Sequence, residues 1–239
     1  MKFTVLIPSR YDSSRLPGKP LEDLNGKSLI QRVYEAASLS KAERVVVATD
    51  SVLIQEECTR FNGESVLTKS SHLTGSDRLS EAASILSMKE DQIVVNLQGD
   101  EPFMSFNDIN EVASLLENSQ ASMSTLYANL PEESFDNPNV VKIWVNKDGG
   151  VLDFSRDKNK LKEGHAHRFQ HIGIYSYQVG FLNNFIRWQQ TDNEILESLE
   201  QLRVLDRGYK IAASKSFSSI HLGIDTPEDL ANARVILSK

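Results

Sequence analysis

The sequence predicts an α/β protein with a mostly parallel central sheet and a less regular α+β elaboration in its second half. Over residues 1–120, short apolar runs alternate with amphipathic segments, which is the pattern of parallel strands joined by helices. After residue 120, strand-like runs follow one another closely, and the tetrapeptide at 147–150, K-D-G-G, is a hairpin signal. No linker or repeat interrupts the 239 residues, so we expect a single domain spanning 1–239.

The first half is expected to contain strands that are buried on both faces, because each is a continuous apolar run. These strands are expected at 3–7, 44–49, 64–68 and 92–97, and the helices at 28–40, 52–61, 76–86 and about 107–118. Ligands of parallel sheets bind beyond the carboxyl ends of the strands. That rule directs attention to the loops 8–19, 49–51 and 98–102.

The second half is expected to add strands and helices with shorter connections. Strands are expected at 123–128, 140–146, 151–154, 168–177 and 209–214, and helices at 181–188 and 194–206. A last helix begins at Thr226-Pro227, where threonine is a favoured N-cap and proline suits the first turn.

Composition excludes several classes of protein. Hydrophobic residues make up 40% and charged residues 25%, as in ordinary globular proteins, and the net charge of -7 argues against a nucleic-acid surface. The only cysteine, Cys58, lies in a helical run without a nearby base, so it is interpreted as a packing residue rather than a nucleophile. No segment resembles a signal peptide or a transmembrane span. We expect a soluble cytoplasmic protein without a membrane partner.

The loop after the first strand reads P-S-R-Y-D-S-S-R-L-P-G-K and concentrates positive charge. Arg10, Arg15 and Lys19 lie within ten residues, and small residues such as Ser14 leave backbone amides accessible. Cations beside open amides at the carboxyl end of a strand can bind a polyphosphate. The alternative is a solvated basic loop. The segment is neither a Walker loop nor a G-x-G-x-x-G dinucleotide motif.

Two aspartates are candidate ligands of a hard cation such as Mg²⁺. Asp100, in Q-G-D-E-P, follows the strand predicted at 92–97, although Gly-Asp is also common in turns. Asp225 precedes the last helix, whose cap is already explained by Thr226, so Asp225 is left as a second ligand. A zinc site made of His165, His167 and His171 is disfavoured, because their spacing matches no zinc signature and no cysteine is near.

These motifs resemble, in order and over nearly the whole chain, the CMP-Kdo synthetases, or 3-deoxy-manno-octulosonate (Kdo) cytidylyltransferases. The resemblance rests on IPSRYDSSRLPGKP (7–20), ATD (48–50), TGSDRLSEA (74–82), VVNLQGDEP (94–102), HIGIYSY (171–177), LEQLRVL (199–205) and GIDTPEDL (223–230). It implies a Rossmann-like nucleotidyltransferase fold, usually homodimeric, that uses Mg²⁺ and CTP to activate an acidic sugar for lipopolysaccharide biosynthesis.

The resemblance also implies roles for individual residues. Residues 1–120 would mainly bind the nucleotide, and residues 121–239 would supply sugar-binding and dimerisation elements. The triphosphate and nucleotide would be held by Arg10, Ser14, Arg15, Lys19 and Arg78, and Mg²⁺ by Asp100 and Asp225, with Lys19, Asp100 and Asp225 catalytic. The sugar would be bound by Gln98, Arg156, His171, Tyr175 and Glu200. From the residues alone, two interpretations of the strand face that carries His171 and Tyr175 are equally good. It could bind the sugar, or it could be a mixed face of the protein core.

The implied reaction is an in-line attack of the anomeric hydroxyl of the sugar on the α-phosphorus of CTP, with release of pyrophosphate. Three alternatives stay open: a CMP-sialate synthetase, another sugar nucleotidyltransferase, and a non-catalytic nucleotide-binding regulatory protein. A dehydrogenase is disfavoured because the glycine motif is absent.

The chain departs from the family pattern near the expected sugar site. Typical members carry arginine before H-I-G-I-Y, where this chain has Gln170, and a Pro-Trp stretch after F-S-R, where it has DKNKLKEGHAH. A lost cation, with Asp157 and Glu163 gained, would favour a positively charged group such as that of an 8-amino analogue of Kdo. Neutral drift of a surface loop explains the change equally well.

Overall fold

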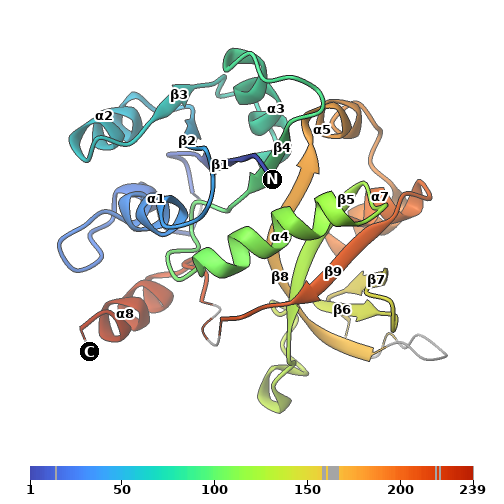
Figure 1. Cartoon of the computed structure of the whole chain (residues 1–239). Helices are drawn as coiled ribbons and strands as arrows, with labels where there is room; N and C mark the ends of the chain where they lie inside the picture. Colours follow the sequence, from blue (N-terminus) through green and yellow to red (C-terminus); the bar gives the residue numbers. More distant parts are fainter. Residues whose placement is uncertain (14, 158–159, 161–166, 219, 221, 239) are drawn as a thin grey trace.

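The computed structural model describes the chain except for residues 14, 158–159, 161–166, 219, 221 and 239. The strands of the first half are β1 (Phe3–Ser9), β2 (Arg44–Thr49), β3 (Ser65–Leu67) and β4 (Ile93–Asn96). The strands of the second half are β5 (Met123–Ala128), β6 (Lys142–Val145), β7 (Val151–Ser155), β8 (His167–Gln178) and β9 (Ile211–Lys215). They form a sheet in the order β3-β2-β1-β4-β8-β5-β9, with β6 pairing to both β7 and β8 (Figure 1).

Helices cover both faces of this sheet. They are α1 (Leu29–Ser38), α2 (Val52–Arg60), α3 (Gly75–Ile85), α4 (Phe106–Asn118), α5 (Val179–Phe185), α6 (Asp192–Glu197), α7 (Leu202–Asp206) and α8 (Pro227–Ile236), with short 3-10 turns η1 (Lys19–Leu21) and η2 (Glu132–Ser134). Alternate residues of β1 point to opposite faces: Val5 and Ile7 belong to a core cluster with residues of α1, α2, α4 and α8, whereas Leu6 belongs to a second cluster with residues of α3, α5 and α7. Figure 1 shows α4 crossing one face of the sheet.

The parallel part of the sheet agrees with the sequence prediction. β1 pairs in parallel with β2 and β4, and β2 pairs in parallel with β3. Each of these strands, and each of the helices α1 to α4, lies within about two residues of its predicted bounds. The carboxyl ends of β1 and β4 therefore lie side by side, which brings the loops 8–19 and 98–102 together.

The second half depends on the long strand β8. It runs antiparallel to β4, β5 and β6, and so it joins the parallel part of the sheet to the β6–β7 hairpin predicted at 147–150. Asn96, at the end of β4, lies opposite Tyr175 of β8. This pairing places the second half of the chain beside the carboxyl ends of the parallel strands.

The single helix expected at 194–206 is wrong. The structure has two short helices there, because Ser198 adopts a left-handed backbone conformation, with φ of 52° and ψ of 48°, that ends α6. Leu199 and Leu202, on either side of the start of α7, are buried against the sheet. After the break the chain turns, and the half-buried Glu200 accepts a 2.8 Å hydrogen bond from the Ser76 hydroxyl of α3.

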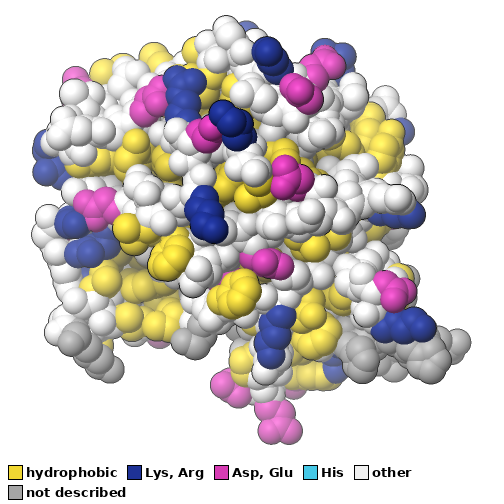
Figure 2. All heavy atoms as spheres, in the orientation of Figure 1, with side chains coloured by type: hydrophobic (Ala, Val, Ile, Leu, Met, Phe, Trp, Pro, Cys, Tyr) yellow, Lys and Arg dark blue, Asp and Glu magenta, His cyan; other side chains and the backbone are white. Residues whose placement is uncertain are grey.

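Cys58 is a packing residue, as predicted. Its side chain is buried in the cluster formed by α1, α2 and α4, and burial raises the pKa of its thiol to about 12. Among the described residues, no helix has both the length and the apolar character needed to cross a bilayer. On the face drawn in Figure 2, acidic and basic side chains are interspersed, without a large area of either sign.

Candidate functional site

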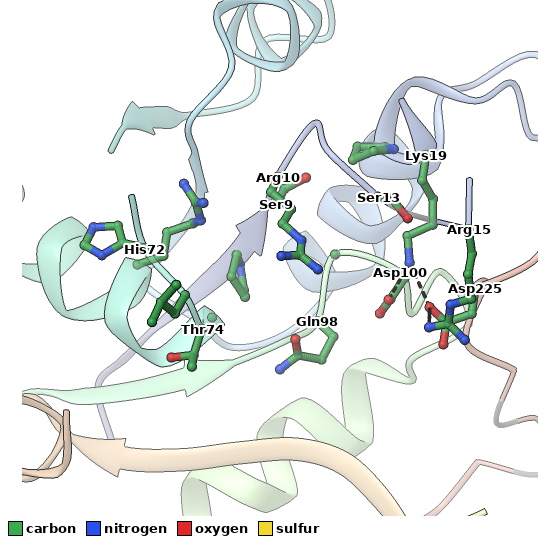
Figure 3. Close-up of a pocket in the computed structure, with 16 residues that line it drawn as sticks. Ser9, Arg10, Ser13, Arg15, Lys19, His72, Thr74, Gln98, Asp100 and Asp225 are labelled. Carbon is green, nitrogen blue, oxygen red and sulfur yellow. Dashed lines mark hydrogen bonds and ion pairs between the residues drawn. The ribbon is translucent and has the colours of Figure 1, made fainter. Parts of the chain in front are cut away.

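A cavity of about 280 Å³ lies at the carboxyl ends of β1 and β4 (Figure 3). It is bounded by the loop after β1, the start of α3, the loop after β4 and the segment before α8. The lining residues are Pro8, Ser9, Arg10, Ser13, Arg15, Lys19, Pro20, His72, Leu73, Thr74, Gly75, Arg78, Gln98, Gly99, Asp100 and Asp225. Most residues predicted for the nucleotide and the metal are thus brought to one place.

One end of this cavity holds two carboxylates around a single ammonium group. Lys19 Nζ lies 2.7 Å from Asp100 Oδ2 and 3.1 Å from Asp225 Oδ1, and an Arg15 guanidinium nitrogen lies 3.0 Å from the same Asp225 oxygen. Figure 3 shows the three chain segments converging at this point. The predicted approach of Asp100 and Asp225, although they are far apart in sequence, is therefore confirmed.

Local structure positions each member of this group. Gly18 has φ of 70°, a left-handed conformation suited to glycine, and it turns the chain so that Lys19 begins η1. Gly99 lies so close to β1 that an added Cβ would stand 2.8 Å from the carbonyl oxygen of Pro8. The loop of Asp100 is joined to the segment that precedes α8 by a backbone hydrogen bond. The carbonyl oxygen of Asp100 accepts this bond from the Ile224 amide at 2.9 Å.

The helix α8 is capped without using the side chain of Asp225. Thr226 and Asp229 form a capping box, and Asp229 also accepts a hydrogen bond from the backbone amide of Asp225. The carboxylate of Asp225 is consequently turned toward Lys19. Helix capping therefore does not account for the presence of a carboxylate at position 225.

The remaining cations of the cavity differ in how far they are already engaged. Arg10 is exposed, extends into the cavity near Gln98 in Figure 3, and makes no side-chain hydrogen bond or ion pair with a described residue. Arg78 is buried and pairs with Asp50 at 2.8 Å and with Thr68 at 2.7 Å, so its guanidinium stabilises the cavity wall. The predicted nucleotide contact of Arg78 stays a prediction. Ser14 lies outside the described residues.

A second cavity, of about 90 Å³, adjoins the first. Gly75 and Gln98 line both. The other residues around it are Ser76, Asn96, Met123, Tyr175, Tyr177, Phe185, Glu200 and Gln201. Three of the five residues predicted for the sugar, Gln98, Tyr175 and Glu200, thus meet at one cavity of mixed polar and apolar lining beside the first.

Comparison with known proteins identifies the family. Residues 4–211 match the cytidylyltransferase family. A 3-deoxy-manno-octulosonate cytidylyltransferase of Histophilus somni is 44% identical over 255 residues, covering 100% of this chain and 99% of the relative. The chain belongs to the Kdo cytidylyltransferase family. A second member, from Photobacterium profundum, is 43% identical over 99% of this chain and its own full length.

Solved structures agree with this assignment. A CMP:2-keto-3-deoxy-manno-octonic acid synthetase, solved in complex with CTP, superposes with a TM-score of 0.91 and 34% identity, covering 100% of this chain and 99% of the other. A 4-diphosphocytidyl-2C-methyl-D-erythritol synthase shares the fold at a TM-score of 0.66 and 15% identity. The Rossmann-like nucleotidyltransferase fold predicted from the sequence is therefore confirmed.

Two residues expected in the sugar site of a Kdo cytidylyltransferase do not line either cavity. Arg156 donates from Nε to the carbonyl oxygen of Glu197 at 3.0 Å, and its backbone amide donates to the Glu197 carboxylate at 2.7 Å. His171 lies behind Tyr175, where Nε2 is 2.9 Å from the Thr125 hydroxyl. Burial, with a smaller contribution from Arg156, lowers the pKa of His171 to about 3, so the imidazole is neutral. Sugar contacts of Arg156 and His171 stay predictions.

The three histidines considered for a zinc site are described only in part. His171 is buried against Thr125, while His165 and the side chain of His167 lie outside the described residues. No group of three or more His, Cys, Asp or Glu side chains converges among the residues searched.

The donor set of Asp100 and Asp225 fits Mg²⁺. This cation typically takes one or two protein carboxylates and completes its octahedron with water and phosphate oxygens. The ammonium group of Lys19 already lies between the two carboxylates, so the electrostatic environment at this position favours a cation. The magnesium requirement itself stays a prediction.

Sequence reasoning missed several residues of the cavities. His72 lines the end opposite the carboxylates, with Nε2 2.5 Å from Glu81 Oε2, and Thr74 caps α3 beside it. Glu101, next to Asp100, lines neither cavity, and its pKa is raised to about 8 by burial and by the charges of Asp100 and Asp225. Thr74 begins the T-G-S-D-R motif and His72 lies two residues before it. The capping pattern of Thr74 and Asp77 could have indicated that a helix starts at this motif. No local sequence pattern indicates that Glu101 is partly buried.

Proposed function

We propose that this chain transfers CMP from CTP to the anomeric hydroxyl of Kdo and releases pyrophosphate. The observation that carries the proposal is the pair Asp100 and Asp225 around Lys19, at one end of a cavity that shares Gly75 and Gln98 with a second, smaller cavity. The names of the relatives, and the CTP bound to one structural neighbour, support the same nucleotide and the same sugar.

In this reaction the protein mainly positions reactants and stabilises charge. The triphosphate would lie along the larger cavity, with Arg10, Arg15 and Lys19 binding its oxygens and stabilising the negative charge of the departing pyrophosphate. The sugar would enter from the smaller cavity, so that its anomeric oxygen approaches the α-phosphorus opposite the leaving group. Mg²⁺ held by Asp100 and Asp225 would neutralise the α-phosphate and favour deprotonation of the attacking hydroxyl.

Lys19 has two roles in this scheme. Without nucleotide its ammonium separates two carboxylates that would otherwise repel one another, and its side chain is only 13% exposed. With nucleotide it would turn part of its hydrogen bonding toward phosphate. Because a lysine ammonium has three donors on a flexible stem, such a change of partners needs no movement of the backbone.

The proposal extends to the setting of the enzyme. The family resemblance suggests a homodimer working in the cytoplasm, in the pathway that supplies activated Kdo for lipopolysaccharide. Sedimentation or size-exclusion chromatography at several protein concentrations would measure the oligomeric state.

The test of the function is a pyrophosphate-release screen with each of the four nucleoside triphosphates and a panel of acidic sugars. We expect release with CTP and Kdo. Release with CTP and sialic acid would support a CMP-sialate synthetase instead. Nucleotide binding without release for any sugar would support a regulatory protein.

The sugar could also be the 8-amino analogue of Kdo. Gln170, which replaces the usual arginine, lies opposite Lys142 in the register of β6 and β8. Asp157 follows Arg156 just after β7. Glu163 lies outside the described residues. The loss of the arginine predicts a higher kcat/KM for the 8-amino analogue than for Kdo, because an ammonium group is then less repelled. Both values should be measured at one pH and one magnesium concentration. A clear preference for Kdo would mean that the substitution is neutral drift.

The cationic loop gives a further prediction. Lys19→Ala and Arg15→Ala should each reduce kcat/KM for CTP by about 10- to 150-fold, corresponding to about 1.5–3 kcal/mol for a charge-assisted hydrogen bond. Lys147→Ala, an exposed change in the hairpin turn, is the matched control and should leave kcat/KM unchanged. Wild-type kcat/KM in both loop variants would contradict the assignment of the loop to triphosphate binding and would support the alternative of a solvated basic loop.

A further inference from the structure

The carboxylate of Asp50 connects the cationic loop of residues 8–19 to the wall of the larger cavity. Asp50 follows β2 directly, and its side chain is only 15% exposed. Its Oδ2 accepts a 2.8 Å hydrogen bond from the Arg78 guanidinium, and its Oδ1 accepts a 3.3 Å bond from the Tyr11 backbone amide. Asp50 itself lines neither cavity, so it can influence a bound nucleotide only through these two partners.

The guanidinium partner of Asp50 is firmly held by the fold. Arg78 lies near the start of α3, its side chain is 4% exposed, and it also donates to the Thr68 hydroxyl at 2.7 Å. Thr68 in turn donates to the carbonyl oxygen of Thr49 at 3.0 Å, at the end of β2. The contacts of Arg78 thus come from the ends of β2 and β3, and Arg78 is a fixed anchor for the Asp50 carboxylate.

The backbone partner of Asp50 lies where the cationic loop closes on itself. The carbonyl oxygen of Tyr11 accepts a 3.2 Å hydrogen bond from the Gly18 amide. Gly18 precedes Lys19, whose ammonium lies between the two carboxylates of the expected metal site. Arg10 precedes Tyr11 and makes no side-chain hydrogen bond or ion pair with a described residue, so its backbone mainly determines where its charge can lie. The bond from Tyr11 to Asp50 therefore fixes the point from which both cations extend.

We propose that Asp50 is a positioning residue for triphosphate binding, which holds the Tyr11 amide and so sets where Arg10 and Lys19 lie. The inference rests on the proposed function, because it takes the larger cavity as the binding site of CTP. A carboxylate suits this position, since its two oxygens can accept from a guanidinium and from a backbone amide at the same time. Phosphate oxygens are bound well only by donors in the right geometry, so a small displacement of the loop should weaken the binding of CTP.

Asp50→Asn tests this role, because asparagine keeps one acceptor oxygen and replaces the other with an amino group that cannot accept a hydrogen bond. We expect the KM for CTP, and the Kd of CTP measured by calorimetry, to rise about tenfold, with a smaller fall in kcat and no change in the KM for the sugar. Asp50→Glu keeps the charge beside Arg78 but moves both oxygens by one methylene, so it should also raise the KM for CTP.

Glu194→Gln is the matched control for a role in stability alone. Glu194 also accepts a hydrogen bond from a buried guanidinium, that of Arg203, but it lines neither cavity. This variant should lower the Tm, as Asp50→Asn does, yet leave the KM for CTP unchanged. A wild-type KM for CTP in Asp50→Asn would overturn the proposal, as would an equal rise in Glu194→Gln or the failure of both Asp50 variants to fold.

A double-mutant cycle with Arg10→Ala separates positioning of the loop from a general effect on the fold. In the Arg10→Ala background, Asp50→Asn should raise the Kd of CTP by a smaller factor than in the wild-type background, because one of the charges that Asp50 positions is already absent. Equal factors in the two backgrounds would mean that Asp50 acts independently of this cation and would overturn the proposal. Absence of CTP binding to the wild-type protein would instead overturn the proposed function.

Discussion

Asp100→Asn and Asp225→Asn should each lower kcat for pyrophosphate release by about a thousandfold or more, because each removes a negative charge that a hard cation requires. The shape of the side chain is kept. Folding should be largely spared, since the ion pairs to Lys19 are partly exposed and each variant keeps one of the two carboxylates. The measurements are kcat at saturating CTP and sugar, and Tm by circular dichroism.

Asp12→Asn is the matched control for these two variants. Asp12 is an exposed carboxylate in the same loop as Lys19, but it does not line the cavity. Its replacement should leave kcat and Tm unchanged. Wild-type kcat in either Asp100→Asn or Asp225→Asn would remove the assignment of both residues to a cation site.

Arg203→Ala should destabilise the protein by about 3–5 kcal/mol, because it leaves the carboxylate of Glu194 buried without its partner. The two side chains are only 5% and 4% exposed, and Arg203 Nε donates to Glu194 Oε2 at 2.7 Å. The guanidinium also lies 4.5 Å from the centre of the Phe185 ring. For a chain of this size the loss corresponds to a fall in Tm of roughly 10 °C.

The exposed pair Arg44 and Glu64 provides the comparison. Its side chains are 42% and 41% exposed, so Arg44→Ala should cost less than about 1 kcal/mol. Replacing both buried partners, with Arg203→Met and Glu194→Leu together, should recover much of the stability lost in Arg203→Ala. Equal losses of Tm in Arg203→Ala and Arg44→Ala would show that burial of the pair contributes nothing.

The parallel half of the fold could be predicted closely because its signals are local. Continuous apolar runs mark β1, β2 and β4, and helical periodicity marks α1, so each could be placed without knowing its neighbours. The proximity of Asp100 and Asp225 could also be predicted. Asp100 lies just beyond the carboxyl end of a strand, and the family resemblance assigns Asp225 to the same metal site.

The sugar side was less predictable because it depends on long-range pairing. Tyr177 reaches the smaller cavity only because β8 runs antiparallel to β4, and no local pattern states which strand will be its neighbour. Ser198 ends α6 in a left-handed conformation that serine rarely adopts, so a continuous helix was the natural expectation. The burial of His171 against Thr125, rather than toward a cavity, likewise depends on a partner distant in sequence.

The pairing of β8 with β4 also limits how this enzyme can change during evolution. Tyr175 and Tyr177 face the smaller cavity because both lie on the same side of β8, two residues apart. Inserting or deleting one residue within this part of the strand would turn both rings to the opposite face of the sheet and abolish the cavity wall. New sugar preferences should therefore arise through side-chain replacements at constant register, or through length changes in loops outside β8. Natural variation in length should be absent from 171–177.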